Sequence, residues 1–337
     1  MQIPPAHQPP LACSWAPVTE NASPATANAP GHLLGRVLYG ETSAATSNPA
    51  AAVDACIPLH MNGLPSWMES WYSATPVQTV HCSADLLARG NQHVLWGCAS
   101  APMAANDNGQ ANVKALYQAL FGLLQQHGYP HLWRIWNFIP HINQPDDHGL
   151  ETYRVFNLGR AEALAQGMAR HMPAATAVGC AGDALQVYFL AGRAPSQHIE
   201  NPRQMPAWRY PPEHGPQPPS FARATQVALP RQNLLFISGT ASIIGHQTVY
   251  VGDWAGQCRT ALENIRLMAQ RTGRSLHALD HFKVYVRHAH QLGGIQSLLQ
   301  AALPPTAKTA YFVADICREE LLVEIEAMGA SSVFTGQ

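Results

Sequence analysis

The chain has 337 residues, of which 47% are hydrophobic and 12% are charged, and its formal net charge is -1 at pH 7. This composition predicts a soluble globular protein that is large enough for two domains. A net charge so close to zero excludes a strong field for nucleic acid or an anionic membrane, so we expect neither as a partner. We expect a cytoplasmic protein, because the sequence shows neither a long apolar stretch nor a signal-peptide pattern.

The cysteines and histidines do not form a known metal motif. The 7 cysteines are widely spread and never occur as Cys-x-x-Cys, and the 17 histidines never occur as His-Glu-x-x-His. We therefore expect free thiols and no bound metal. Nucleotide-binding glycine loops are also missing, so we expect no cofactor.

The first 30 residues are rich in Pro, Ala and Asn and show no periodic spacing of apolar residues, which predicts a poorly ordered leader over residues 1–30. Residues 31–150 should form an N-terminal half that contains a helix over 111–126 and a strand over 133–139.

Residues 151–224 should connect the halves and line a pocket. Within them, 201–219 carries seven prolines, which predicts an irregular loop lying across that pocket.

Residues 225–337 should form a C-terminal half. Its expected elements are strands over 234–238 and 249–251, a helix over 254–270, a strand over 281–287, a helix over 292–302, and strands over 310–313 and 321–327. This order predicts an α+β fold in which helices cover one face of a mixed sheet. A helix followed by a strand recurs in both halves at a shift of about 145 positions, so we expect the halves to be related.

Two acids interrupt the apolar strand predicted over 321–327. The alternation of a strand places Glu324 and Glu326 on one face, with Val323 and Ile325 on the other. A carboxyl group held against apolar walls has a raised pKa and can donate a proton at neutral pH. An edge strand whose acidic face is in water explains the same pattern, and the local sequence leaves both interpretations open.

Seven segments between residues 130 and 330 resemble the chorismatases and occur in the same order. They are WNFIPHIN (136–143), YRVFNLGR (153–160), NPRQ (201–204), YPPEHGP (210–216), PSFARA (219–224), ISGTASIIGH (237–246) and ADICR (314–318). The C-terminal half, over 252–327, also resembles the RidA/YjgF-like fold, which is chorismate mutase-like. The resemblance therefore implies two such halves, a degenerate one over 31–150 and a catalytic one over 225–337. Because small RidA/YjgF-like domains form trimers, it also implies a homo-oligomer, in particular a trimer.

The resemblance implies an enzyme that cleaves the enolpyruvyl ether of chorismate and releases pyruvate. Glu324 would protonate the enol methylene carbon, which leaves an oxocarbenium ion. Attack by water would give a dihydroxycyclohexadiene carboxylate, whereas attack by the neighbouring ring hydroxyl, followed by aromatisation, would give 3-hydroxybenzoate, with 4-hydroxybenzoate as a further product. Gly239 and Cys317 match the benzoate-forming group, because the hydrolytic group tends to carry Ala and an aliphatic residue there. Gly239 could instead serve a turn, and Cys317 could be a small core residue.

The two carboxylates of chorismate require at least two cationic anchors. The resemblance points to Arg160 and Arg223, with hydroxyl groups from Tyr153, Tyr210 and Thr240 as further substrate contacts. The arginines could instead pair with structural carboxylates, and the tyrosines could belong to the core.

Two other function classes stay open. An imine deaminase of the RidA type needs an arginine that grips a carboxylate, and Arg318 is displaced from the register of that family. A ligand-binding protein without activity would keep Arg160 and Arg223 but would not need Glu324.

Overall fold

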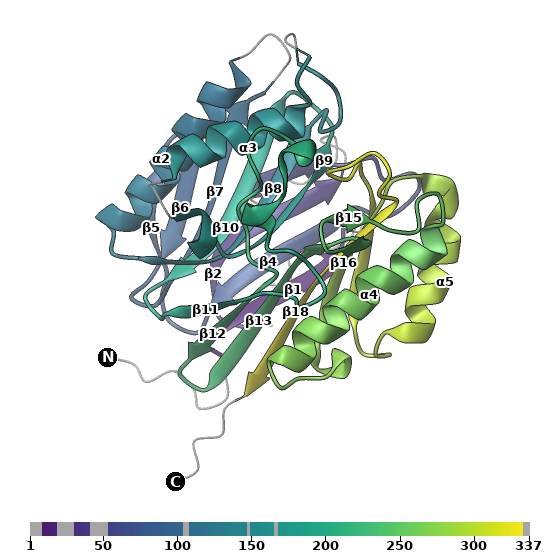
Figure 1. Cartoon of the computed structure of the whole chain (residues 1–337). Coiled ribbons are helices and arrows are strands. Elements are labelled where there is room, and N and C mark those ends of the chain that lie inside the picture. Colours follow the sequence, from purple (N-terminus) through teal and green to yellow (C-terminus); the bar gives the residue numbers. More distant parts are fainter. Residues whose placement is uncertain are drawn as a thin grey trace.

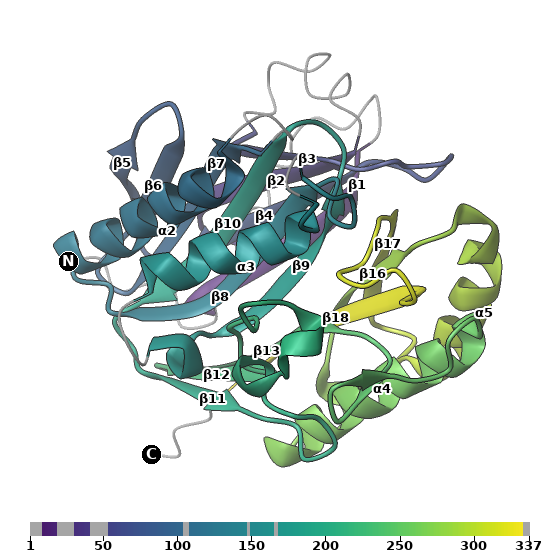
Figure 2. The same ribbon diagram turned by 45° about the horizontal axis from the view of Figure 1, so that its top comes forward.

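The computed structural model describes residues 9–18, 30–40, 53–103, 108–146, 149–164 and 168–332. In this part of the chain, three main sheets surround a shared hydrophobic core, and helices cover the outer faces of two of them (Figures 1 and 2). None of the described helices has the length and apolar character needed to span a membrane.

The first six-stranded sheet has the order β5-β6-β7-β10-β8-β9. Its elements are β5 (Gln78–Cys82), β6 (Leu86–Gly90), β7 (Val94–Pro102), α2 (Gly109–Gln126), β8 (His131–Pro140), α3 (Thr152–Ala163), β9 (Ala174–Cys180) and β10 (Ala184–Gly192). The helices α2 and α3 pack on its outer face through a separate apolar cluster.

The second six-stranded sheet has the order β11-β12-β13-β18-β16-β17. Its elements are β11 (Ser196–Ile199), β12 (Ala224–Leu229), β13 (Gln232–Thr240), α4 (Trp254–Arg271), β16 (His281–Val286), α5 (Leu292–Ala302), β17 (Lys308–Val313) and β18 (Val323–Ser332). Asp253 caps the N-terminus of the helix α4: its Oδ1 accepts hydrogen bonds from the amides of Ala255 and Gly256, which satisfies two free N–H groups of the first turn.

The two sheets have the same topology, which confirms the prediction of two related α+β halves. The strand β7 pairs with β10 in the first sheet, as β13 pairs with β18 in the second. The strands β10 and β18 also pair antiparallel with β8 and β16, which follow the helices α2 and α4. The strands β9 and β17 then pair parallel with β8 and β16. The helices α2 and α4 begin at Gly109 and Trp254, which fits the shift found in the sequence.

A third sheet, which the sequence did not predict, has four strands in the order β1-β4-β2-β3. They are β1 (Leu11–Pro17), β2 (His32–Gly40), β3 (Ala55–Pro58) and β4 (Trp67–Ser73). All seven residues of β1 pair with β4, so the described part of the expected leader is an ordered strand. The rest of that leader, 1–8 and 19–29, lies outside the described residues.

Two other expectations differ from the structure. The segment 151–224 does more than connect the halves, because it contributes α3, β9 and β10 to the first and β11 to the second. The strand expected over 249–251 is wrong, because the chain forms only the short ribbon β14 (Ile243–Ile244) and β15 (Gln247–Thr248) and then turns at Tyr250, whose φ is 59°.

Candidate active site

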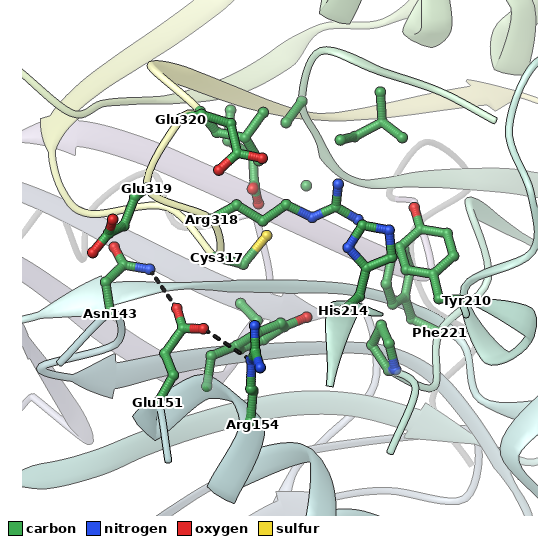
Figure 3. A pocket seen from close by; sticks show the side chains of 18 of the residues that line it. Asn143, Glu151, Arg154, Tyr210, His214, Phe221, Cys317, Arg318, Glu319 and Glu320 are labelled. Atoms are coloured by element: carbon green, nitrogen blue, oxygen red, sulfur yellow. Dashed lines mark hydrogen bonds and ion pairs between the residues drawn. The ribbon is translucent and has the colours of Figure 1, made fainter. Parts of the chain in front are cut away.

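A cavity of about 580 Å³ lies between the two halves. Its walls come from α3, the loop before β12, the end of β13 and the loop that leads into β18 (Figure 3). The strand β9 holds the halves together beside it, because the amide of Gly179 donates to the carbonyl of Asp315 (2.7 Å). Seven of the eight predicted site residues line this cavity: Tyr153, Arg160, Tyr210, Arg223, Gly239, Cys317 and Glu324.

Thr240 does not line the cavity. Successive side chains of β13 point to opposite faces, so the position next to Gly239 faces away. The hydroxyl of Thr240 instead donates to the carbonyl of Ser238 (2.6 Å).

Glu324 has the environment of a neutral acid. Its side chain extends from β18 and is only 4% exposed. Burial raises the pKa of Glu324 to about 8, the nearby charge of Glu326 adds to this, and Arg134 and Arg223 offset part of it. Glu324 is therefore protonated at neutral pH, as a general acid must be.

Glu326 lies on the same face of β18 but has a different role. Its carboxylate accepts hydrogen bonds from Arg134 Nη2 (2.9 Å), Trp136 Nε1 (2.8 Å) and the hydroxyl of Thr176, and Lys283 Nζ lies 2.9 Å away. Burial acts to raise its pKa, but the charges of Lys283 and Arg134 together with the hydrogen bonds hold that pKa below its usual range. Glu326 is thus an ionised structural acid, and the shared face carries one neutral and one charged carboxyl group.

The ionised acid belongs to a buried network that joins all three sheets. Lys283 Nζ also pairs with Glu69 on β4 (2.8 Å) and donates to the hydroxyl of Tyr188 on β10 (2.7 Å). The hydroxyl of Tyr39 on β2 donates to Glu69 (2.8 Å). Because every charge here has an opposite partner, the network can stay buried.

Arg160 and Arg223 provide buried positive charge at the cavity. Arg160 is 2% exposed and Arg223 is 6% exposed, and among the described residues neither forms a salt bridge. Arg160 donates to Asn157 Oδ1 (3.0 Å), and Arg223 donates to the hydroxyl of Tyr210 (2.8 Å) and the carbonyl of Met205 (3.0 Å). Within the described part of the chain, neither guanidinium group has a carboxylate within salt-bridge distance, so both can pair with an anionic ligand.

Tyr153 and Arg160 reach the cavity together because they are seven residues apart on α3 and therefore share one face of the helix. Burial raises the pKa of the Tyr153 hydroxyl well above its usual value, so this group remains a hydrogen-bond donor. The sequence pattern YRVFNLGR thus presents a donor and a charge at one wall.

Gly239 and Cys317 shape the space around Glu324. A Cβ atom at Gly239 would lie 1.9 Å from Glu324 Oε1, so the missing side chain makes room for the acid. Burial, and then the charge of Glu324, raise the pKa of Cys317 to about 12. Cys317 is therefore a neutral thiol that forms a wall of the cavity and not a nucleophile.

Several lining residues were not predicted from the sequence, although they lie in segments singled out there. Arg154 pairs with Glu151, and the amide of Asn143 donates to the same carboxylate (3.0 Å) (Figure 3). Arg318 donates to the carbonyl of His246 (2.9 Å), and its guanidinium lies 5.3 Å from the ring centre of Tyr210. Arg154 directly follows Tyr153 in the chain and Arg318 directly follows Cys317, and this was the available signal.

One residue behind the site holds the loop that carries Cys317. The guanidinium of Arg287 donates to the carbonyls of Ile316, Arg318 and Leu321, and to the side chain of Asp315 on the same loop. It also donates to Asn143 Oδ1 of the first half (3.1 Å). Arg287 thereby fixes this loop relative to both halves.

The fold and the site together define an α+β enzyme whose cavity is lined by two buried arginines and a neutral buried acid. A family model described as "Chorismatase FkbO/Hyg5-like, N-terminal" matches residues 69–191. A chorismatase of Streptomyces rapamycinicus is 40% identical over 279 residues, which cover 79% of this chain and 83% of the relative. A 3-hydroxybenzoate synthase of Streptomyces hygroscopicus is 42% identical over 233 residues, which cover 64% of this chain and 68% of the relative.

A crystal structure of a chorismatase has the same fold, with a TM-score of 0.85 and 33% identity over 95% of this chain and 98% of the other. The chain belongs to the chorismatase family.

Proposed function

We propose that the protein cleaves the enolpyruvyl ether of chorismate and releases pyruvate and 3-hydroxybenzoate. The observation that carries this proposal is the buried carboxyl group of Glu324, which faces a cavity with two arginines that form no salt bridge among the described residues. The relative named 3-hydroxybenzoate synthase supports the choice of product.

The substrate would be held by its two carboxylates. Arg160 and Arg223 extend from different walls of the cavity, α3 and the segment before β12, so each can take one carboxylate. The hydroxyl of Tyr210 accepts a hydrogen bond from Arg223, which leaves its proton free for the same carboxylate. Tyr153 offers a second hydroxyl donor.

Glu324 would start the reaction by protonating the terminal methylene carbon of the enolpyruvyl group. The carbon–carbon double bond supplies the electron pair for the new C–H bond, and the positive charge is shared with the ether oxygen. The carboxyl group becomes a carboxylate, which stabilises the oxocarbenium ion through space.

The shape of the cavity would decide how the cation reacts. Pyruvate and hydroxybenzoate together have the composition of chorismate, so this route consumes no net water, whereas formation of the diene diol consumes one. The missing side chain of Gly239 leaves room for the carboxyl of Glu324, and Cys317 lines the same cavity. Both residues match the pattern that the resemblance gives for the benzoate-forming group. The ring hydroxyl next to the ether is then the nucleophile: its oxygen attacks the ring carbon that bears the ether, the bond from that carbon to the ether oxygen breaks to release pyruvate, and the hydroxyl proton passes to the Glu324 carboxylate. The resulting epoxide would open and lose one ring proton, which gives 3-hydroxybenzoate.

The described residues that line the cavity come from both halves of the chain.

The proposal is tested by incubating the purified protein with chorismate after exhaustive chelation. Pyruvate is followed by a coupled dehydrogenase assay, and the ring products are separated by chromatography. We expect 3-hydroxybenzoate in amounts equal to pyruvate, less any 4-hydroxybenzoate. The diene diol as main product, or activity that depends on added metal, would contradict the proposal.

A further inference from the structure

Three ligand-type side chains, those of Glu213, His214 and His246, lie close together. Glu213 and His214 line the cavity, where Figure 3 shows His214 beside Arg318 and Tyr210, and Arg318 donates to the carbonyl of His246. Glu213 and His214 belong to the short 3-10 helix Pro212–His214, and His246 lies in the turn between β14 and β15. His214 Nε2 lies 3.0 Å from His246 Nδ1, and Glu213 Oε1 lies 3.5 Å from the former and 3.3 Å from the latter.

Protons alone do not satisfy this triangle. A neutral imidazole nitrogen is either a donor or an acceptor, and an ionised carboxylate is only an acceptor. If His214 donates to His246, the lone pairs of His246 Nδ1 and Glu213 Oε1 face each other at 3.3 Å. At least one edge therefore joins two acceptors.

The triangle has the size of a metal site. The point equidistant from the three atoms lies about 1.9 Å from each of them, by the distances above. Bonds from Zn²⁺ to histidine nitrogen and carboxylate oxygen are about 2.0–2.2 Å long. An ion held by these three atoms would keep a fourth coordination position for water or a ligand atom.

We propose that Glu213, His214 and His246 form a binding site for one divalent transition-metal ion, for which Zn²⁺ fits the donors best. Two imidazole nitrogens and one carboxylate oxygen form a donor set that binds Zn²⁺ in preference to Mg²⁺ or Ca²⁺. The side chains are 61%, 20% and 24% exposed, respectively, so an ion can enter from solvent.

The charges around the site are compatible with a cation. Arg318 is the nearby positive group, and its guanidinium donates to the carbonyl of His246 and to Thr248. Two carboxylates add negative charge near Arg318. One is Glu213 itself, and the other is Glu320, which accepts a hydrogen bond from the hydroxyl of Thr248 (2.8 Å).

The site would act as a clamp and not as part of the ether cleavage. The ion would join the proline-rich loop, which lines the cavity with Tyr210 and His214, to the β14–β15 turn, which follows the lining residue Ile243 in the chain. Sequence analysis predicted no metal because His214 and His246 are 32 positions apart and form no motif.

The test is binding of Zn²⁺ and of Co²⁺ to the chelated, fully reduced protein without chorismate. We expect one equivalent of Zn²⁺ by calorimetry, a raised melting temperature, and Co²⁺ absorption bands of a four-coordinate ion without the charge-transfer bands of thiolate ligands. Replacing both ligand histidines, His214→Ala/His246→Ala, should abolish the one-equivalent binding.

The matched control is His288→Ala/His290→Ala, which removes a stacked and exposed histidine pair elsewhere. This variant should bind one equivalent as the wild type does. Absence of one-equivalent binding in the wild type, or its persistence when His214 and His246 are replaced, would overturn the proposal. Neither readout uses turnover, so the outcome is independent of the proposed reaction.

Discussion

The contact between Gly239 and Glu324 predicts how a single methyl group changes the enzyme. In Gly239→Ala the new Cβ would lie 1.9 Å from Glu324 Oε1 and 2.9 Å from its Cδ. An ordinary carbon–oxygen contact is about 3.3 Å, so the carboxyl group must retreat by about 1.4 Å. Gly239 has no positive φ, so the backbone accepts alanine and the effect comes from the side chain alone.

A displacement of this size at the acid should slow pyruvate release by about 10- to 100-fold, which corresponds to ~1.4–2.7 kcal/mol in activation free energy. The same displacement of the Glu324 carboxyl group changes its position relative to the ring hydroxyl of chorismate. We therefore expect the double variant Gly239→Ala/Cys317→Val to divert product from 3-hydroxybenzoate toward the diene diol while pyruvate is still released.

The assay measures pyruvate and all three ring products over the same time course. Gly122→Ala is the matched control, because no atom lies within 4 Å of a Cβ there and the position is in the helix α2. It should keep both rate and product ratio. A wild-type rate and ratio in Gly239→Ala would refute the steric reasoning.

Three further predictions follow from the charges at the site. Glu324→Gln should lower kcat by about two to four orders of magnitude, and because Glu324 must be protonated, wild-type kcat should fall with rising pH above its pKa of about 8. Arg160→Ala and Arg223→Ala should each lower kcat/KM by at least about 100-fold, because a carboxylate in the cavity loses its charged partner. Glu326→Ala should lower the free energy of unfolding by about 3–5 kcal/mol in chemical denaturation, because Lys283 and its neighbours lose a buried counter-charge.

Each of these predictions has a control and a contrary outcome. Near-normal turnover in Glu324→Gln would show that another residue is the general acid. Arg259→Ala, at an exposed position on α4, should leave kcat/KM unchanged, and equal kinetics in an Arg160 variant would give that arginine a structural role. Glu263→Ala removes an exposed ion pair and should cost less than about 1 kcal/mol, so an equally small loss for Glu326→Ala would contradict the buried network.

The sequence by itself determined the local elements and the face on which the two acids lie. The period of the apolar positions predicted the helices α4 and α5 and the strand β16 almost to their ends. Alternation along β18 placed Glu324 and Glu326 together, because successive side chains of a strand point to opposite faces whatever the rest of the fold is. The recurrence of a helix and a strand likewise indicated the two halves.

Only the tertiary structure decided which of the two acids is neutral. Two cations hold Glu326 ionised: Arg134 on β8 and Lys283 on β16. Lys283 also pairs with Glu69, which lies in the sheet that the sequence did not predict. Glu324 faces the cavity between the halves instead and stays protonated. A pKa depends on charges within a few ångströms, and those charges are supplied by residues distant in the sequence, so no local pattern could separate the two.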